Sequence, residues 1–157
     1  MGQEIRETTF PARTYLVWRK QVEIAKITDS AMWGEAFGKV FQEAQKGGMK
    51  IAGPAAALYF SWNEESGVTE LGIGIPVEEA AEVSDPDLSL ASIEESDASA
   101  ITVIGSYDGL RSAHEAMWGY ISEKGLQPGL TVEEYEVTEH EAPNVEDWRT
   151  NVYYLHK

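Results

Sequence analysis

Apolar residues fall into two successive stretches of the chain that share one order of elements. In the first stretch, the β-branched and aromatic residues of 14–19 predict a strand. Apolar residues then recur at helical spacing and predict a helix that ends near Gly47. The strands 56–62 and 68–77 are predicted next, on either side of a polar hairpin loop. The predicted order is therefore strand, helix, strand, strand.

The second stretch repeats this order with little residue identity. A strand is predicted over 100–107, a helix over 109–124, and two strands over 130–138 and 147–155, with Gly125 ending the helix. One helix on a small sheet leaves the other face open, so two such units need each other. We therefore predict an α+β fold of two tandem units with antiparallel sheet, related by a pseudo-twofold axis, with a central ligand pocket where they meet.

Residues 78–99 differ from both stretches. They hold eight acidic residues, no Lys and no Arg, which indicates a solvated acidic connector. The chain is then a single domain, with unit one at about 13–77 and unit two at about 100–157. Deleting part of 80–97 is expected to cost little stability, because few large apolar side chains would lose burial.

Composition narrows the classes of partner. The chain has 27 acidic and 12 basic residues, a formal net charge of −15 and no cysteine. This charge disfavours nucleic acid and anionic membrane surfaces, and it favours cationic small molecules or a basic protein partner. The sequence shows no secretory signal and no apolar run long enough for a transmembrane helix, so we expect a cytoplasmic protein.

The common chemical motifs are missing from the sequence. His114, His140 and His156 are isolated, and no pair at metal-ligand spacing exists, so no metal site is predicted. No nucleophile motif is visible, and the two glycines of 72–74 lack the rest of a dinucleotide fingerprint. We therefore expect no cofactor.

The order of elements, with Tyr59, the segment Tyr135-Glu136-Val137 and the ending 148–154, resembles the GyrI-like effector-binding domain family. This family includes ligand-binding domains of AraC-type and MerR-type multidrug regulators, as well as stand-alone small proteins. The resemblance covers about 13–155 and implies an aromatic pocket whose buried glutamate meets lipophilic cations. Only about a dozen residues precede the first predicted strand, so we expect a stand-alone member without a helix-turn-helix domain.

The resemblance also implies which carboxylate lies in the pocket. The family glutamate stands in a Glu-x-Tyr context, which Glu136 matches except that Thr138 takes the place of the tyrosine. Glu134 shares the strand face of Glu136, and from the residues alone both could be ordinary exposed acids. Glu133 lies on the opposite strand face, and its replacement is expected to change little.

Aromatic side chains are expected to form the rest of the site, because ring faces attract cations. Tyr153 and Tyr154 point to opposite sides of the last strand, so one should line the site while the other packs. The predicted ligand-binding residues are Glu136, Trp118, Tyr59, Tyr107, Trp33, Tyr153 and Tyr154.

These observations predict a protein that binds lipophilic, aromatic, cationic small molecules with low selectivity. The first alternative is a hydrolase of strained cyclopropanoid genotoxins, as some stand-alone GyrI-like proteins are, with Glu136 as the catalytic carboxylate. The second is an acidic module that inhibits another protein, as gyrase-inhibitor relatives suggest. The sequence leaves all three open, because a counter-ion and a catalytic base need the same residue.

Overall fold

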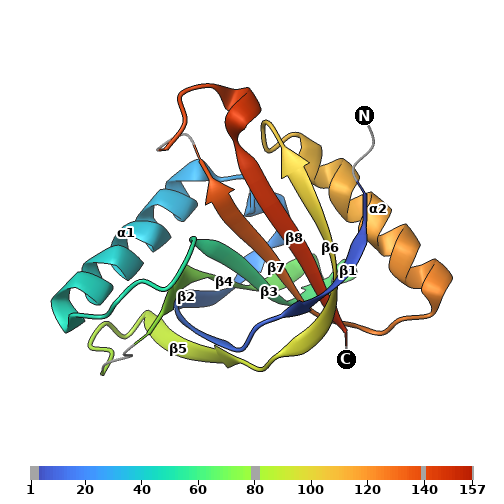
Figure 1. Ribbon diagram of the computed structural model, residues 1–157. Helices are drawn as coiled ribbons and strands as arrows, with labels where there is room; N and C mark the ends of the chain where they lie inside the picture. Colours follow the sequence, from blue (N-terminus) through green and yellow to red (C-terminus); the bar gives the residue numbers. More distant parts are fainter. Residues whose placement is uncertain (1–3, 79–81, 139–140, 157) are drawn as a thin grey trace. The chain divides into compact units, whose positions relative to one another are not determined.

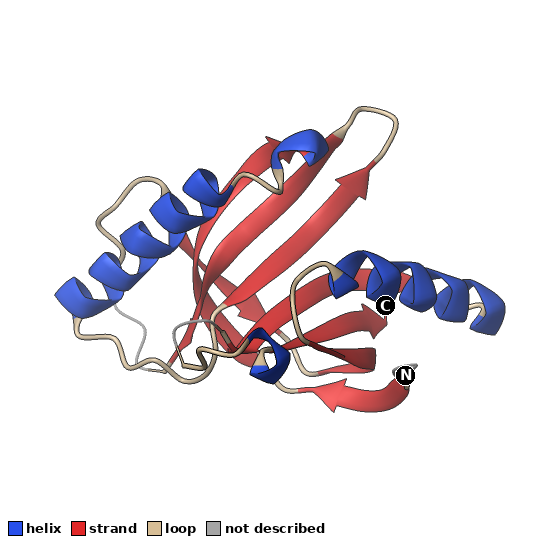
Figure 2. Cartoon of the chain, turned by 90° about the horizontal axis from the view of Figure 1, so that it is seen from above, coloured by secondary structure: helices blue, strands red, loops and turns tan. Residues whose placement is uncertain are grey.

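The computed structural model describes residues 4–78, 82–138 and 141–156. The chain divides into two compact units: an N-terminal unit, Ala12–Glu94, and a C-terminal unit, which combines Met1–Pro11 with Glu95–Lys157. In each unit a single long helix lies against strands that pair antiparallel (Figures 1 and 2). The predicted α+β class and antiparallel pairing are confirmed.

The N-terminal unit pairs its strands in the order β3-β4-β2-β5. Its helix packs on β2 and β4. The elements are β2 (Arg13–Glu23), a short 3-10 turn (Ile24–Lys26), α1 (Ser30–Gly47), β3 (Ala56–Asn63), β4 (Val68–Val77) and β5 (Leu88–Ile93).

The C-terminal unit has the corresponding order β1-β6-β8-β7. In both units the strand before the helix lies between an added edge strand and the last strand of the repeat, so the predicted tandem repeat is confirmed. The elements are β1 (Arg6–Phe10), β6 (Ser96–Ile104), α2 (Gly109–Lys124), β7 (Pro128–Val137), a 3-10 turn (Val145–Asp147) and β8 (Arg149–His156).

Both helices end where the glycines predict. Gly48 and Gly125 cap α1 and α2 in the left-handed conformation, at φ of 66° and 67°, which costs glycine little. At the other end of α1, the Asp29 carboxylate accepts a hydrogen bond from the Ala31 N–H at 3.0 Å. No described helix combines the length and the apolar character that crossing a membrane requires.

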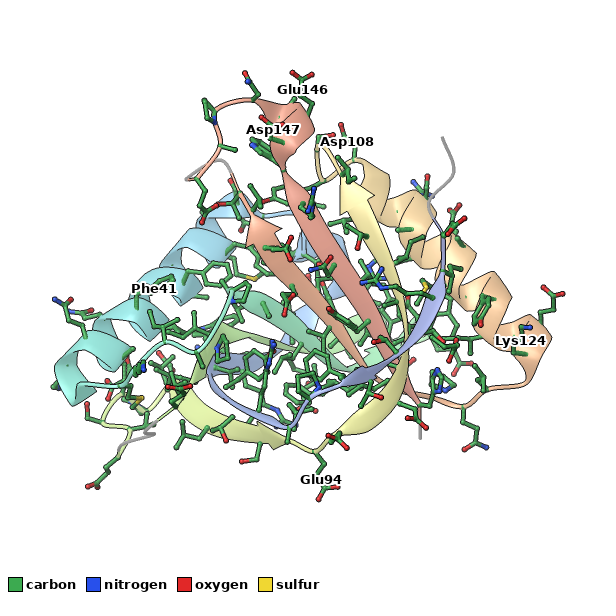
Figure 3. All side chains as sticks on the ribbon, in the orientation of Figure 1. Phe41, Glu94, Asp108, Lys124, Glu146 and Asp147 are labelled. Atoms are coloured by element: carbon green, nitrogen blue, oxygen red, sulfur yellow. The ribbon has the colours of Figure 1, made fainter. Side chains whose placement is uncertain are left out.

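Each unit has its own apolar core between helix and sheet. The apolar stripe that α1 buries is Ala36, Val40 and Ala44. Phe41, which follows Val40 and is labelled in Figure 3, is 45% exposed. The N-terminal core contains Leu16, Val40, Ala44, Met49, Ile75, Val77 and Leu88. The C-terminal core contains Ile101, Val103, Ala113, Met117, Ile121, Val152 and Tyr154.

The structure corrects the interpretation of 78–99 as a solvated connector. Strand β5 lies inside this segment and pairs with β2, with Leu88 opposite Trp18 and Ile93 opposite Arg13. Strand β6 begins at Ser96, so most of the segment's second half is paired sheet. Residues 79–81, which belong to the same segment, lie outside the described residues. The expectation that this region can be shortened at little cost is therefore wrong for β5 and β6.

A pair of leucine variants on β5 measures this correction. Leu88 is 6% exposed and belongs to the core, whereas Leu90 is 41% exposed on the same strand. We expect Leu88→Ala to lower the free energy of unfolding in urea by about 2–4 kcal/mol, and Leu90→Ala by less than about 1 kcal/mol. Equal small effects would restore the connector interpretation.

Candidate functional site

A buried carboxylate, Glu133, lies on the face of β7 that α2 covers. Glu133 pairs with Val152 of β8, which belongs to the core that packs on α2. Its side chain is 7% exposed. One oxygen, Oε2, lies 2.6 Å from Nε2 of His114, and the other, Oε1, accepts a hydrogen bond from the Tyr135 hydroxyl at 2.8 Å. The carboxylate is therefore held by two donors on two elements.

His114 joins Glu133 to a second hydroxyl group. Its Nδ1 lies 2.6 Å from the Tyr154 hydroxyl of β8. Burial raises the pKa of Tyr154 well above its ordinary value, and the negative charge of Glu133 adds to this effect. The Tyr154 hydroxyl therefore keeps its proton and is available as a hydrogen-bond donor.

The direction of these hydrogen bonds follows from the chemistry of the groups. When Glu133 is ionised, its carboxylate only accepts, so in that state the proton between His114 and Glu133 sits on Nε2. A neutral imidazole then has Nδ1 as its acceptor, and the Tyr154 hydroxyl donates to it. In this state the three hydrogen-bonded side chains of Tyr154, His114 and Glu133 together carry one net negative charge.

Aromatic rings continue from this group on both sides. Tyr107 packs edge-on against Tyr135, with ring centroids 5.9 Å apart, and lies 5.6 Å from the ring of Trp148. On the helix side, Trp118 meets Tyr154 edge-on at 5.7 Å. Tyr107 and Trp118 are 43% and 48% exposed, so the row of rings extends from the buried carboxylate to the protein surface. We call this set the Glu133 cluster: Glu133, His114, Tyr154, Tyr135, Tyr107, Trp148 and Trp118.

Local sequence explains why these side chains meet. On α2, the core residues Ala113 and Met117 face the sheet, and His114 and Trp118 follow them one position later at a spacing of four, so they share a flank of the helix. On β7, side chains alternate, which puts Glu133 on the helix side. Figure 1 shows α2 alongside the strands of this unit.

The predicted carboxylate, Glu136, lies in different surroundings. Its side chain is 42% exposed, and Oε2 is 3.7 Å from a guanidinium nitrogen of Arg149. The Asn151 amide donates to Glu134 at 3.0 Å and to Glu136 at 3.4 Å. Glu134 and Glu136 therefore share a side of the strand, as expected, and it is the side away from Glu133. The pocket role of Glu136 stays a prediction.

The last strand places its two tyrosines as predicted. Tyr154 is 2% exposed and belongs to the core under α2, whereas Tyr153 makes an edge contact with Phe10 of β1 at 5.1 Å. They lie on opposite faces of β8. Of the predicted ligand-binding residues, the structure thus brings Trp118, Tyr107 and Tyr154 into the Glu133 cluster.

Two predicted residues belong to the N-terminal unit. The indole N–H of Trp33 donates to the Ile27 carbonyl at 2.7 Å, and its ring lies 6.2 Å from that of Phe37. Tyr59 of β3 meets Trp62 edge-on at 5.9 Å. The ligand-binding roles of Trp33 and Tyr59 stay predictions.

Sequence reasoning missed four members of the cluster: Glu133, His114, Tyr135 and Trp148. A signal for two of them was present, because Glu133-Glu134-Tyr135 is itself a Glu-x-Tyr sequence. For His114 the only local signal was its spacing of four from Trp118. The structure also shows no group of three His, Asp or Glu side chains in the described ranges that could hold a metal ion.

Comparison with known proteins finds solved structures that share the fold of this chain. No protein-family model matches the sequence, and no curated protein matches it. The chain is similar to the crystal structure of the EcmrR C-terminal domain, with 16% identity and a TM-score of 0.80, over 100% of this chain and 99% of that one. It matches EcmrR in an EcmrR–DNA complex with 16% identity and a TM-score of 0.83, over 99% of this chain, and spans 57% of that chain's length.

Two further similarities are to a protein bound to a small molecule and to a hydrolase. SAV2435 bound to tetraphenylphosphonium is 13% identical, with a TM-score of 0.69, over 100% of this chain and 94% of that one. A hydrolase from Listeria innocua is 12% identical, with a TM-score of 0.59, over 98% and 92% of the two chains. The predicted resemblance to GyrI-like effector-binding domains is thereby confirmed at the level of the fold.

Proposed function

We propose that this chain binds lipophilic aromatic cations and that Glu133 supplies the counter-charge. The observation that carries the proposal is a carboxylate with 7% side-chain exposure at the centre of a row of aromatic rings. Such a carboxylate is costly to bury unless a partner repays the lost hydration, which is why buried acids mark functional sites. The fold shared with SAV2435, which was determined with tetraphenylphosphonium bound, supports this ligand class.

The chemistry of the cluster favours breadth over selectivity. Each oxygen of Glu133 has one donor, so neither is fully saturated. Each aromatic face contributes about 0.5–2 kcal/mol to the binding free energy of a cation, and stacking accepts ligands of many shapes. One charge and several rings therefore suit many planar or propeller-shaped cations.

Calorimetric titration tests the proposal with a matched pair of ligands. We expect methyltriphenylphosphonium, a cation with three phenyl rings, to bind at least about tenfold more tightly than neutral triphenylphosphine oxide, which has the same three rings; this ratio corresponds to about 1.4 kcal/mol. The net charge of −15 attracts any cation at long range, so the titration is repeated in high salt, where that attraction is screened. Equal affinities at high salt, or no binding of either ligand, would contradict the proposal.

One observation favours a hydrolase as the second candidate. The 2.6 Å contact between His114 and Glu133 forms an acid–base pair beside aromatic rings, and the Listeria innocua hydrolase shares the fold. A carboxylate in this position could take a proton from a water molecule while the water oxygen bonds to one cyclopropane carbon. The ring C–C bond then breaks, and the part of the substrate that receives its electron pair takes up a proton from solvent. Incubation with a cyclopropane-bearing alkylator, followed by mass spectrometry, separates the candidates. More than one product molecule per protein supports the hydrolase, whereas binding without turnover supports the first proposal.

A further inference from the structure

We propose that His114 determines the charge specificity of the Glu133 cluster: the site takes a monovalent cation while His114 is neutral and releases it when His114 is protonated. This inference rests on the proposed function and adds to it the residue that sets the charge of the ligand. It follows from the position of the imidazole, which contacts Glu133 through one nitrogen and Tyr154 through the other, both at 2.6 Å.

The neutral state of His114 leaves the cluster with its negative charge. The Tyr154 hydroxyl donates to Nδ1, and Nε2–H donates to Glu133. Since Tyr154 and Tyr135 are neutral donors, the carboxylate is the single charge of the four groups. A ligand with one positive charge then makes the cluster electrically neutral, which is the favourable state for charges removed from water.

The protonated state of His114 supplies that positive charge from within the protein. Both ring nitrogens then donate, so the Tyr154 hydroxyl must turn to accept from Nδ1. The imidazolium and Glu133 form a neutral pair at 2.6 Å, and a cationic ligand meets no net attraction. The proton and the ligand therefore compete for one carboxylate, and by linkage each weakens the binding of the other.

Glu133 and Tyr154 are the titratable groups that contact the His114 ring. Strand β7 contributes Glu133 and β8 contributes Tyr154, while β6 faces α2 with the apolar Ile101 and Val103. On α2 itself, Arg111 is directed to solvent, where its guanidinium lies 3.6 Å from Glu115, with 91% of its side chain exposed. The His114 side chain is 25% exposed, so protons from solvent can reach the ring. Imidazole is the side chain that changes protonation between pH 5 and 8.

The experiment compares tetraphenylphosphonium affinity at pH 7.5 and pH 5.5 in the wild-type chain and in His114→Gln. The glutamine amide retains a donor for Glu133 and does not titrate. We expect the affinity of the wild type to fall by roughly tenfold or more between the two pH values, because one competing proton costs up to tenfold per pH unit. His114→Gln is expected to lose most of the pH dependence, whatever its affinity at pH 7.5.

Two measurements on the wild type keep the inference testable if the variant folds poorly. Near pH 6, ligand binding should release protons, which appears as a dependence of the binding enthalpy on buffer ionisation enthalpy. At a fixed pH near 6, adding the cation should change the ring signals of His114, one of three histidines, toward those of the neutral imidazole. Each result supports the competition of proton and ligand.

The outcomes separate this inference from the function on which it rests. If the wild type fails to bind tetraphenylphosphonium at pH 7.5, the proposed function falls and this inference falls with it. If the wild type binds with a pH-independent affinity and no proton release, or if His114→Gln shows the same pH dependence as the wild type, His114 does not set the charge. In either of those cases the proposed function stands.

Discussion

Gly74→Ala is expected to lower the free energy of unfolding by at least about 3 kcal/mol, the largest stability effect that we predict for a single methyl group. A β-carbon at this position would lie 2.0 Å from the carbonyl oxygen of Leu16 and 2.8 Å from Cγ1 of Val17. The first of these atoms is backbone. Val17 is also the residue that pairs with Gly74 between β2 and β4, so relief of the clash requires breaking the centre of the sheet.

Two other glycines give graded controls in the same urea-unfolding measurement. At Gly72 the added carbon would lie 2.9 Å from the Phe60 ring, a side chain that can shift. We therefore expect Gly72→Ala to lower the free energy of unfolding by less than Gly74→Ala does. At Gly119, in α2, nothing lies within 4 Å, and alanine is expected to stabilise by up to about 1 kcal/mol because of its helix propensity. A loss at Gly119 as large as that at Gly74 would show that the close approach of β2 and β4 is not the cause.

The elements that the sequence predicted share a local signal. Both helices and the six repeat strands have apolar periodicity or β-branched runs within a single segment, bounded by glycine or polar turns. The two edge strands, β1 and β5, lack such a signal. Arg6–Phe10 buries only Phe10 and pairs with β6, about 90 residues away, and this partner cannot be inferred from a five-residue pattern.

The acidic residues around β5 explain the error there. A density of carboxylates usually indicates a solvated segment, yet this segment is bound to α1 at two points. Asp87 is bound by Lys39 at 2.7 Å, and Glu43 of α1 accepts hydrogen bonds from Ser84. These contacts lower the pKa of Asp87 and of Glu43 below their ordinary values, the first mainly through Lys39 and the second mainly through the Ser84 backbone N–H. Charge alone did not show that the segment was paired.

The sequence predicted only part of the Glu133 cluster. Alternation correctly separated Tyr153 from Tyr154 and placed Glu134 and Glu136 together. Alternation does not say which face a helix will cover, and four consecutive residues, 133–136, are polar or aromatic on both faces. The register of β7 also shifts between Tyr135 and Val137, so Glu136 is an extra residue relative to β8. A tertiary contact, that of His114 with Glu133, shows which face of β7 the helix covers.

Glu133→Gln is expected to weaken tetraphenylphosphonium binding by about 10- to 100-fold, or about 1.4–2.8 kcal/mol, the usual range for removing a buried charge partner. The amide keeps the shape of the side chain and can still accept from His114 or Tyr135 through its oxygen. What it lacks is the negative charge that a lipophilic cation requires in an environment poor in water. Neutral triphenylphosphine oxide should therefore change by less than about threefold.

Glu136→Gln is the matched control, because it makes the same chemical change three residues along the same strand. Its carboxylate is 42% exposed and faces Arg149 at 3.7 Å, where water screens its charge. We expect this variant to bind both ligands as the wild type does, and circular dichroism on both variants tests whether they are folded. If Glu136→Gln loses the cation while Glu133→Gln keeps it, the carboxylate predicted from the sequence is the counter-ion. In that case the ligand binds on the strand face away from α2, and the Glu133 cluster is a hydrogen-bonded part of the core.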